Sequence, residues 1–126
     1  MADKRRVVVT GLGVVSPVGS TLDSFWKAIL AGESGIGPIT YFDTTAFDTK
    51  FAGQVKGFNL EEFIPKKEAR RMDPFCHYGI AAAKMAVADS GLDMARENPH
   101  RVGVVAASGV GGLQVMQHNM DVLRTK

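Results

Sequence analysis

The stretch R-V-G-V-V-A-A-S-G-V-G-G at residues 101–112 decides the fold class of this chain. Its first seven residues form a continuous valine-rich run, which is typical of a buried strand. Residues 108–112 are mostly glycine, and an amphipathic helical pattern follows them. Its apolar positions are Leu113, Met116, Met120 and Leu123. A strand that passes through a glycine turn into a helix indicates an α/β protein.

The start of the chain has the same organisation. R-R-V-V-V-T at residues 5–10 predicts a second buried strand, which ends in the turn Gly11-Leu12-Gly13. Ser20, with Asp23 three residues later, predicts the beginning of a helix that Gly32 ends. The apolar face of this predicted helix comprises Leu22, Phe25, Trp26, Ile29 and Leu30.

The middle of the chain mixes turns, a short strand and short helices. Residues 33–49 are rich in turn-forming residues, and the alternation in residues 50–56 predicts a half-buried strand with Phe51, Gly53 and Val55 on one face. Asn59 and Glu62 predict a short helical turn that Pro65 stops, and a second short helix is expected over residues 66–72.

A longer helix is predicted from Asp73-Pro74 to about Ser90, closed by Gly91. It is apolar nearly all round, so it is expected to be buried on most sides. Two strands cannot cover such a helix. The sequence therefore predicts an α/β fold of which only part is present.

Composition excludes several classes of protein. With 126 residues the chain is at most one domain, and its net charge of +2 gives no argument for nucleic-acid binding. It has no run of 18 apolar residues, so a soluble cytoplasmic protein without a membrane segment is expected. The single cysteine and three scattered histidines predict no intrachain disulfide and no metal site. No cofactor is expected.

The glycine motifs allow more than one interpretation. Gly11-x-Gly13 resembles the start of a dinucleotide-binding turn, but Ser16 stands at its third position, so a tight packing turn is favoured. S-G-V-G-G at residues 108–112 lacks the Gly-Lys-Ser/Thr of a phosphate loop and the pattern of a nucleophile elbow. The wall of a binding pocket and a plain packing turn both remain open for it.

Two further groups of side chains could carry chemistry. Cys76 and His77 are adjacent on a predicted helix and point about 100° apart, so they are not expected to form a nucleophile–base pair. Four basic residues are spaced so that two i, i+4 pairs share one helical face. They are Lys66, Lys67, Arg70 and Arg71. Either a solvated face or an anion-recognising patch would explain them.

The chain as a whole resembles the type II elongating β-ketoacyl-acyl-carrier-protein synthases of bacterial fatty-acid synthesis. The resemblance is carried by R-R-V-V-V-T-G-L-G-V-V-S-P-V-G at residues 5–19, F-W-K-A-I-L-A-G-E-S-G-I at 25–36, F-D-T-T-A-F-D-T-K-F-A-G-Q-V at 42–55, and residues 101–112. It covers essentially all 126 residues, which would form the N-terminal portion of the ketoacyl-synthase domain.

The resemblance implies a thiolase-like fold of layered α/β/α/β/α architecture, usually in a homodimer. It also implies a decarboxylative Claisen condensation, in which malonyl-ACP attacks an acyl group held as a thioester on a cysteine. The family's catalytic residues would lie beyond residue 126, so residues 1–126 alone are expected to be inactive and Cys76 matches no catalytic position.

The resemblance assigns supporting roles to residues within the chain. Val110, with Gly109 beside it, matches a position that gates the acyl pocket. The basic residues Lys66, Lys67, Arg70 and Arg71 match a region where acidic acyl carrier protein docks. Two alternatives stay open: a nucleophile-less partner subunit that sets chain length in a polyketide synthase, and a nucleotide-binding α/β domain.

Overall fold

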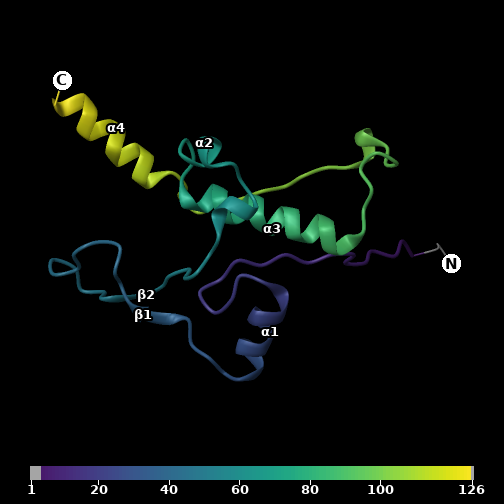
Figure 1. Ribbon diagram of the computed structural model, residues 1–126, viewed down its shortest axis with the longest axis horizontal. Helices are drawn as coiled ribbons and strands as arrows, with labels where there is room; N and C mark the ends of the chain where they lie inside the picture. The colour runs from purple at the N-terminus through teal and green to yellow at the C-terminus, as the bar shows by residue number, and fades with distance from the viewer. Residues whose placement is uncertain (1–3, 126) are drawn as a thin grey trace.

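The computed structural model describes residues 4–125, arranged as an elongated molecule around one central helix (Figure 1). The helices and strands follow one another along the chain as α1 (Leu22–Leu30), β1 (Ile36–Pro38), β2 (Phe51–Gly53), the 3-10 turn η1 (Leu60–Glu62), α2 (Lys66–Ala69), α3 (Pro74–Ser90), the 3-10 turn η2 (Pro99–Arg101) and α4 (Leu113–Thr125).

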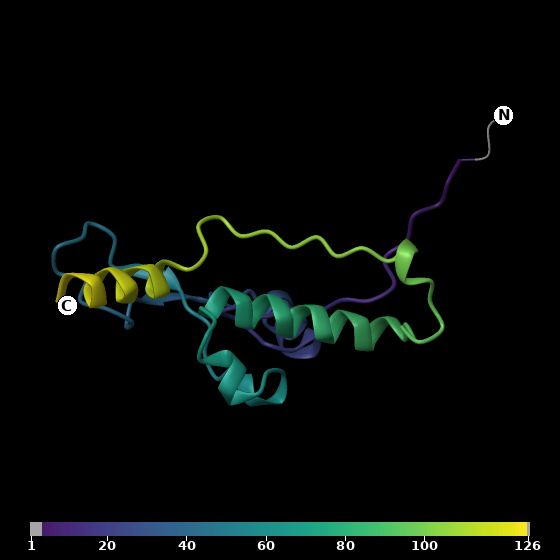
Figure 2. The ribbon, with the colours of Figure 1, turned by 90° about the horizontal axis from the view of Figure 1, so that it is seen from above.

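The two predicted buried strands are extended but unpaired in the described part of the chain. Residues 5–10 and 102–107 belong to no strand ladder, so both predictions are wrong for this structure. Val9 is 78% exposed and Val105 is 98% exposed. Figure 2 shows the second segment running alone between η2 and α4. A strand needs a neighbour to hydrogen-bond, and residues 4–125 supply none here.

The N-terminal segment nevertheless has a fixed place, because it packs closely on α3. A Cβ atom added to Gly13 would overlap the Ala82 carbonyl oxygen and lie 2.8 Å from the Ala86 nitrogen. The Leu12 N–H donates a 2.9 Å hydrogen bond to Asp89 Oδ2. This geometry confirms that Gly11-Leu12-Gly13 is a packing turn, since only glycine lets two backbones approach this closely.

Helix α1 begins one residue later than predicted. Its N-cap is Thr21, whose hydroxyl accepts from the Ser24 N–H, while Ser24 Oγ accepts from the Thr21 N–H. This reciprocal capping box, rather than Ser20 with Asp23, satisfies two of the free amides of the first turn. Gly32 follows the helix with a φ of 69°, as predicted. The apolar face stays largely open, and Ala28 is the buried residue of α1.

Strand β2 pairs antiparallel with β1, in the register Ile36↔Gly53, Gly37↔Ala52 and Pro38↔Phe51. The prediction of a strand within residues 50–56 is therefore confirmed, but the prediction of which side chains lie on its buried face is wrong. Gln54 is buried and its Oε1 accepts from the Thr40 N–H at 3.0 Å, whereas Phe51 is 63% exposed. A specific hydrogen bond outweighs the alternation of apolar residues here.

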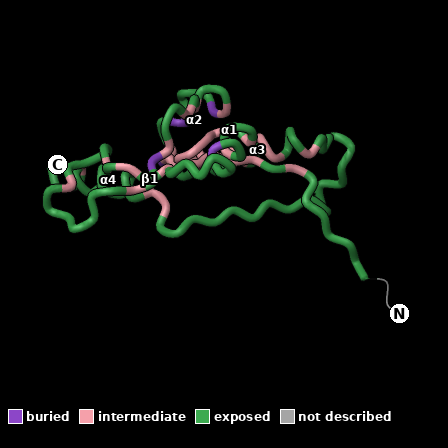
Figure 3. The backbone as a smooth tube through the Cα atoms, turned by 90° about the horizontal axis from the view of Figure 1, so that it is seen from below, coloured by how far each residue is buried: buried purple, intermediate pink, exposed green. Residues whose placement is uncertain are grey.

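Helix α3 has the predicted ends: Asp73 is its N-cap and Gly91 closes it with a φ of 66°. Its predicted burial on most sides is wrong in this structure, where Ala81 is its buried residue. In the described chain the buried apolar residues are Ala28, Ile64, Ala69 and Ala81, and Figure 3 shows how little of the backbone they occupy. The core is too small to enclose α3.

An aromatic cluster joins the η1 segment to α3. Phe58 stacks on Phe63 with ring centroids 5.7 Å apart and meets Tyr78 edge to face at 5.5 Å. Partial burial raises the pKa of the Tyr78 hydroxyl, and the neighbouring Tyr41 adds to the increase. This cluster fixes the segment that leads into α2 against the first half of α3.

Candidate functional site

The glycine loop at residues 108–112 is anchored to the beginning of α3. The ring of Phe75 lies so close to Gly111 that an added Cβ would be 3.2 Å from its Cζ, and Gly111 has a φ of 74°. Asp73 Oδ2 accepts from the Val115 N–H at 3.3 Å and would lie 3.0 Å from a Cβ on Gly112. Glycine at both positions therefore allows the loop to contact α3 closely.

The predicted pocket residues stand on the open side of this loop. Val110 is 78% exposed, and a Cβ on Gly109 would meet nothing within 4 Å. Residues 4–125 thus present Val110 without enclosing it, and its role in a pocket stays a prediction.

The predicted basic helix is shorter than expected. Helix α2 ends at Ala69, with Arg70 as its C-cap. The Arg70 N–H still bonds the Lys66 carbonyl at 3.3 Å, but the Arg71 N–H bonds the Glu68 carbonyl at 3.0 Å, so Lys67 and Arg71 are not one α-helical turn apart. The Met72 N–H likewise bonds the Ala69 carbonyl, three residues back, at 3.1 Å, so the segment ends in a tighter 3-10 turn rather than as a longer α-helix.

All four basic side chains are exposed, and one of them is partly neutralised. Lys66 Nζ lies 3.6 Å from Glu61 Oε1, with both side chains about two-thirds exposed. A surface pair of this kind contributes at most about 1 kcal/mol and leaves the local charge positive. In Figures 1 and 2, α2 and the chain entering α4 both lie at the N-terminal end of α3. The structure therefore brings the basic segment and the glycine loop to the same end of one helix.

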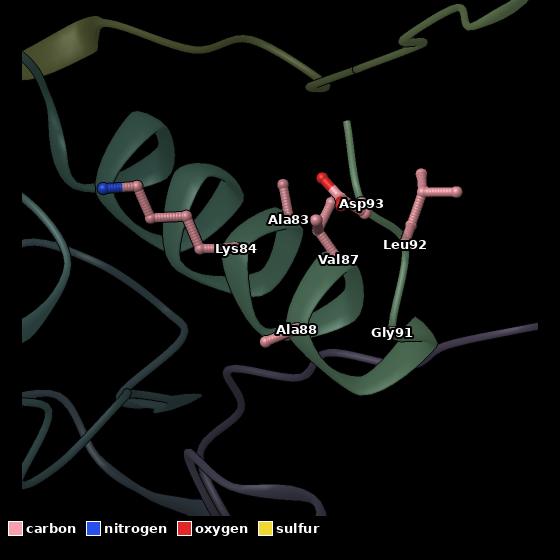
Figure 4. Close-up of a pocket in the computed structure, with 7 residues that line it drawn as sticks. All are labelled: Ala83, Lys84, Val87, Ala88, Gly91, Leu92 and Asp93. Atoms are coloured by element: carbon pink, nitrogen blue, oxygen red, sulfur yellow. The ribbon is translucent and has the colours of Figure 1, made fainter. Parts of the chain in front are cut away.

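An open depression of the described surface lies elsewhere, along the C-terminal half of α3 (Figure 4). It is open to solvent and lined mainly by small or aliphatic side chains, with Lys84 and Asp93 at opposite ends. Neither Val110 nor the basic residues contribute to it. This depression is an uncovered helix face rather than a place where functional groups converge.

Other titratable groups form no reactive constellation among residues 4–125. His77 Nε2 lies 3.0 Å from the Ala69 carbonyl oxygen, which ties its ring to α2 rather than to Cys76. Hydrogen bonds from Thr45 lower the pKa of the exposed Asp43 carboxyl. No group of three or more potential metal ligands occurs in the described chain. The same residues contain no helix long and apolar enough to cross a membrane.

The backbone geometry matches solved ketosynthase structures. A type II polyketide ketosynthase in complex with its acyl-carrier protein aligns with a TM-score of 0.72 and 23% identity, over 94% of this chain and 32% of that one. The ishigamide ketosynthase/chain length factor aligns with a TM-score of 0.63 and 38% identity, over 72% of this chain and 23% of that one. The chain thus has the thiolase-like ketosynthase fold.

Sequence comparison places it within that class. A profile described as β-ketoacyl synthase, N-terminal domain, matches residues 4–126, and the chain belongs to this family. It is 55% identical to 3-oxoacyl-[acyl-carrier-protein] synthase 2 of Vibrio cholerae over 98% of its length, and 42% identical to the Synechocystis protein of the same name. It spans about 30% of the length of these curated relatives.

Proposed function

We propose that this chain is the N-terminal portion of a 3-oxoacyl-ACP synthase that elongates fatty acids. The observation that supports the proposal most strongly is the 55% identity to a curated synthase over 98% of the chain. The reaction is the decarboxylative condensation of malonyl-ACP with an acyl group held on a cysteine beyond residue 126. Residues 1–126 then supply scaffold, part of the acyl pocket and part of the carrier-protein surface, and not the nucleophile.

Acyl transfer tests this assignment directly. Incubated with radiolabelled acyl-ACP, a protein that continues this chain to the relatives' full length should take up one acyl group and, with malonyl-ACP, release 3-oxoacyl-ACP. The polypeptide of residues 1–126 should take up none, because no nucleophile is present to form the thioester. Stoichiometric label on Cys76 of the short polypeptide, or no product from the long one, would contradict the proposal.

The alternative within the same family is a partner subunit without a nucleophile, which sets chain length in a polyketide synthase. The observation that raises it is the 38% identity to a solved structure that combines a ketosynthase with a chain length factor. In the labelling experiment this alternative predicts no acyl group on the long protein alone, and product only after an active ketosynthase is added.

We propose that Lys66, Lys67, Arg70 and Arg71 form a docking surface for acyl carrier protein. They are exposed at one end of α3, and the solved ketosynthase of similar fold is itself in complex with an acyl-carrier protein. Acyl carrier protein is acidic, so opposite charges would speed encounter and fix orientation more than they add affinity. The family resemblance further supports a homodimer in the cytoplasm.

Charge reversal separates docking from a merely solvated surface. Replacing Lys67 and Arg71 by glutamate in the full-length protein should raise KM for malonyl-ACP about tenfold or more at low salt. Turnover of malonyl-CoA should stay nearly unchanged, because that substrate brings no protein surface. The difference should shrink towards 1 M salt, where the Debye length is about 3 Å.

The control for this reversal is Lys27 with Lys56, exposed lysines outside the basic segment. Their conversion to glutamate changes net charge equally and should affect both substrates little. Equal responses of malonyl-ACP and malonyl-CoA to the Lys67 and Arg71 reversal would remove the docking assignment.

Val110 and Gly109 are proposed to line the acyl pocket of the complete protein. Val110 is the largest side chain in a loop otherwise made of serine and glycine, and it projects from the open side of the anchored loop. A larger residue there would occupy space that a long acyl chain needs.

A further inference from the structure

Asp73 occupies an unusual position for a buried carboxylate. It is 8% exposed, and the ion pairs among residues 4–125 join other groups, Lys66 with Glu61 and Arg96 with Asp93. Its backbone forms the N-cap of α3, with φ −78° and ψ 158°, yet its side chain makes no hydrogen bond to that helix. A buried charge without partners is unfavourable, so this carboxylate needs hydrogen-bond donors from outside α3.

Those groups lie at the beginning of α4, 42 residues along the chain. Gly112 precedes α4, and its carbonyl accepts the first bond of that helix, from the Met116 N–H at 3.0 Å. An N-cap residue normally offers a side-chain oxygen to the amide three positions on, which glycine cannot do. Asp73 Oδ2 takes this role from α3 by accepting from the Val115 N–H at 3.3 Å.

Charge and space both suit this arrangement. The N-terminus of a helix carries partial positive charge, so a carboxylate is favoured there and is partly compensated for its burial. The carboxylate also occupies the space next to Gly112, since an added Cβ would approach Oδ2 to 3.0 Å. The neighbouring Gly111 rests on Phe75, in the first turn of the helix that Asp73 begins.

We infer that Asp73 is a positioning residue: it caps α4 from outside and thereby fixes the 108–112 loop that carries Val110. This inference rests on the proposed function, because it makes Asp73 a determinant of acyl-chain selectivity through Val110. Asp73 touches no substrate itself. Loss of its carboxylate frees the first turn of α4, and the loop that enters that turn is left with the contact of Gly111 with Phe75 as its anchor.

The test compares Asp73→Ala and Asp73→Asn with Asp89→Ala in the full-length protein. Asp89 is the control because its carboxylate also accepts a hydrogen bond from a backbone N–H far away in the sequence, that of Leu12. Asp89 lies at the opposite end of α3. Hydrogen exchange of the Val115 amide and the kcat/KM ratio for six- and sixteen-carbon acyl donors are the two measurements. Val110→Phe serves as the positive control and should lower the long-chain rate selectively.

In Asp73→Ala we expect exchange of the Val115 amide to become about tenfold faster, in line with the loss of an N-cap. We expect the ratio of kcat/KM for the six-carbon donor to kcat/KM for the sixteen-carbon donor to change about threefold or more, since small displacements near a reacting substrate have large effects. Asp73→Asn keeps an acceptor oxygen without the charge and should fall between wild type and alanine. Asp89→Ala should accelerate exchange at Leu12 and leave Val115 and the ratio unchanged.

Unchanged exchange at Val115 would overturn the capping role. Faster exchange of the Val115 amide in an active enzyme whose kcat/KM ratio for the two acyl donors is unchanged would overturn the positioning role. If the wild-type protein forms no 3-oxoacyl product, the proposed function fails instead, and with it the link to selectivity, while exchange at Val115 still decides whether Asp73 caps α4. Should Asp73→Ala fail to fold, the comparison of Asp73→Asn with Asp89→Asn distinguishes the same outcomes.

Discussion

Replacing Gly13 by alanine is expected to detach the N-terminal segment from α3 and to destabilise the full-length protein by about 3 kcal/mol or more. The added methyl would overlap the Ala82 carbonyl oxygen and press on the Ala86 nitrogen, and both are helical backbone atoms. Backbone inside a helix cannot rotate away as a side chain can, so the segment itself must move. That displacement would also break the bond from Leu12 to Asp89.

The measurement is the midpoint of denaturant unfolding, with Gly79→Ala as the matched control. Gly79 is an exposed position on the same helix, and an added Cβ there meets nothing within 4 Å. The same chemical change should be neutral or stabilise by up to about 1 kcal/mol, because alanine is the better helix former. Equal stability of Gly13→Ala and wild type would show that the close approach of the turn to α3 is absent in solution.

The isolated polypeptide of residues 1–126 should show no cooperative unfolding transition. Within residues 4–125 the buried apolar residues are Ala28, Ile64, Ala69 and Ala81, while Val104 is 88% and Val105 is 98% exposed. Three alanines and one isoleucine bury too little surface to offset the conformational entropy of so long a chain. Extended segments with open edges also invite association with other chains.

Thermal melting followed by near-ultraviolet circular dichroism tests this expectation. We expect a shallow, non-sigmoidal change and binding of a hydrophobic dye, as in states that lack fixed tertiary packing. The full-length protein is the control and should melt sharply. A steep, concentration-independent melt of the short polypeptide as a monomer would show that these residues form a stable unit alone.

The elements that can be predicted from the sequence are those defined by local chemistry. Asp73-Pro74 and Gly91 fix both ends of α3, and Gly32 follows α1, because caps and left-handed residues act within one turn of chain. The paired strand at residues 36–38 does not emerge from the sequence. Its antiparallel partner lies at residues 51–53, and no local signal specifies that pairing.

The candidate site can be predicted only in part for the same reason. The spacing of the basic residues and the glycines of residues 108–112 mark both parts of the site, but their roles come from the resemblance. The sequence pattern makes Asp73 the cap of its own helix and does not reveal it as an anchor for the loop. A signal for the second role exists in the sequence: α4 starts after Gly111-Gly112, which offers no capping side chain. A helix that begins without a cap needs an acceptor from elsewhere, although the sequence does not say from where.

The contact between Leu12 and Asp89 has a consequence for synthesis on the ribosome. The two residues are 77 positions apart. At about 5–20 residues per second, the valine-rich N-terminus is made about 4–15 seconds before the helix that receives it. During that interval the turn Gly11-Leu12-Gly13 lacks the helix on which it packs, and Leu12 is available to chaperones or to other nascent chains. The rate at which α3 leaves the ribosome therefore sets how long the N-terminal segment stays open to association with other proteins.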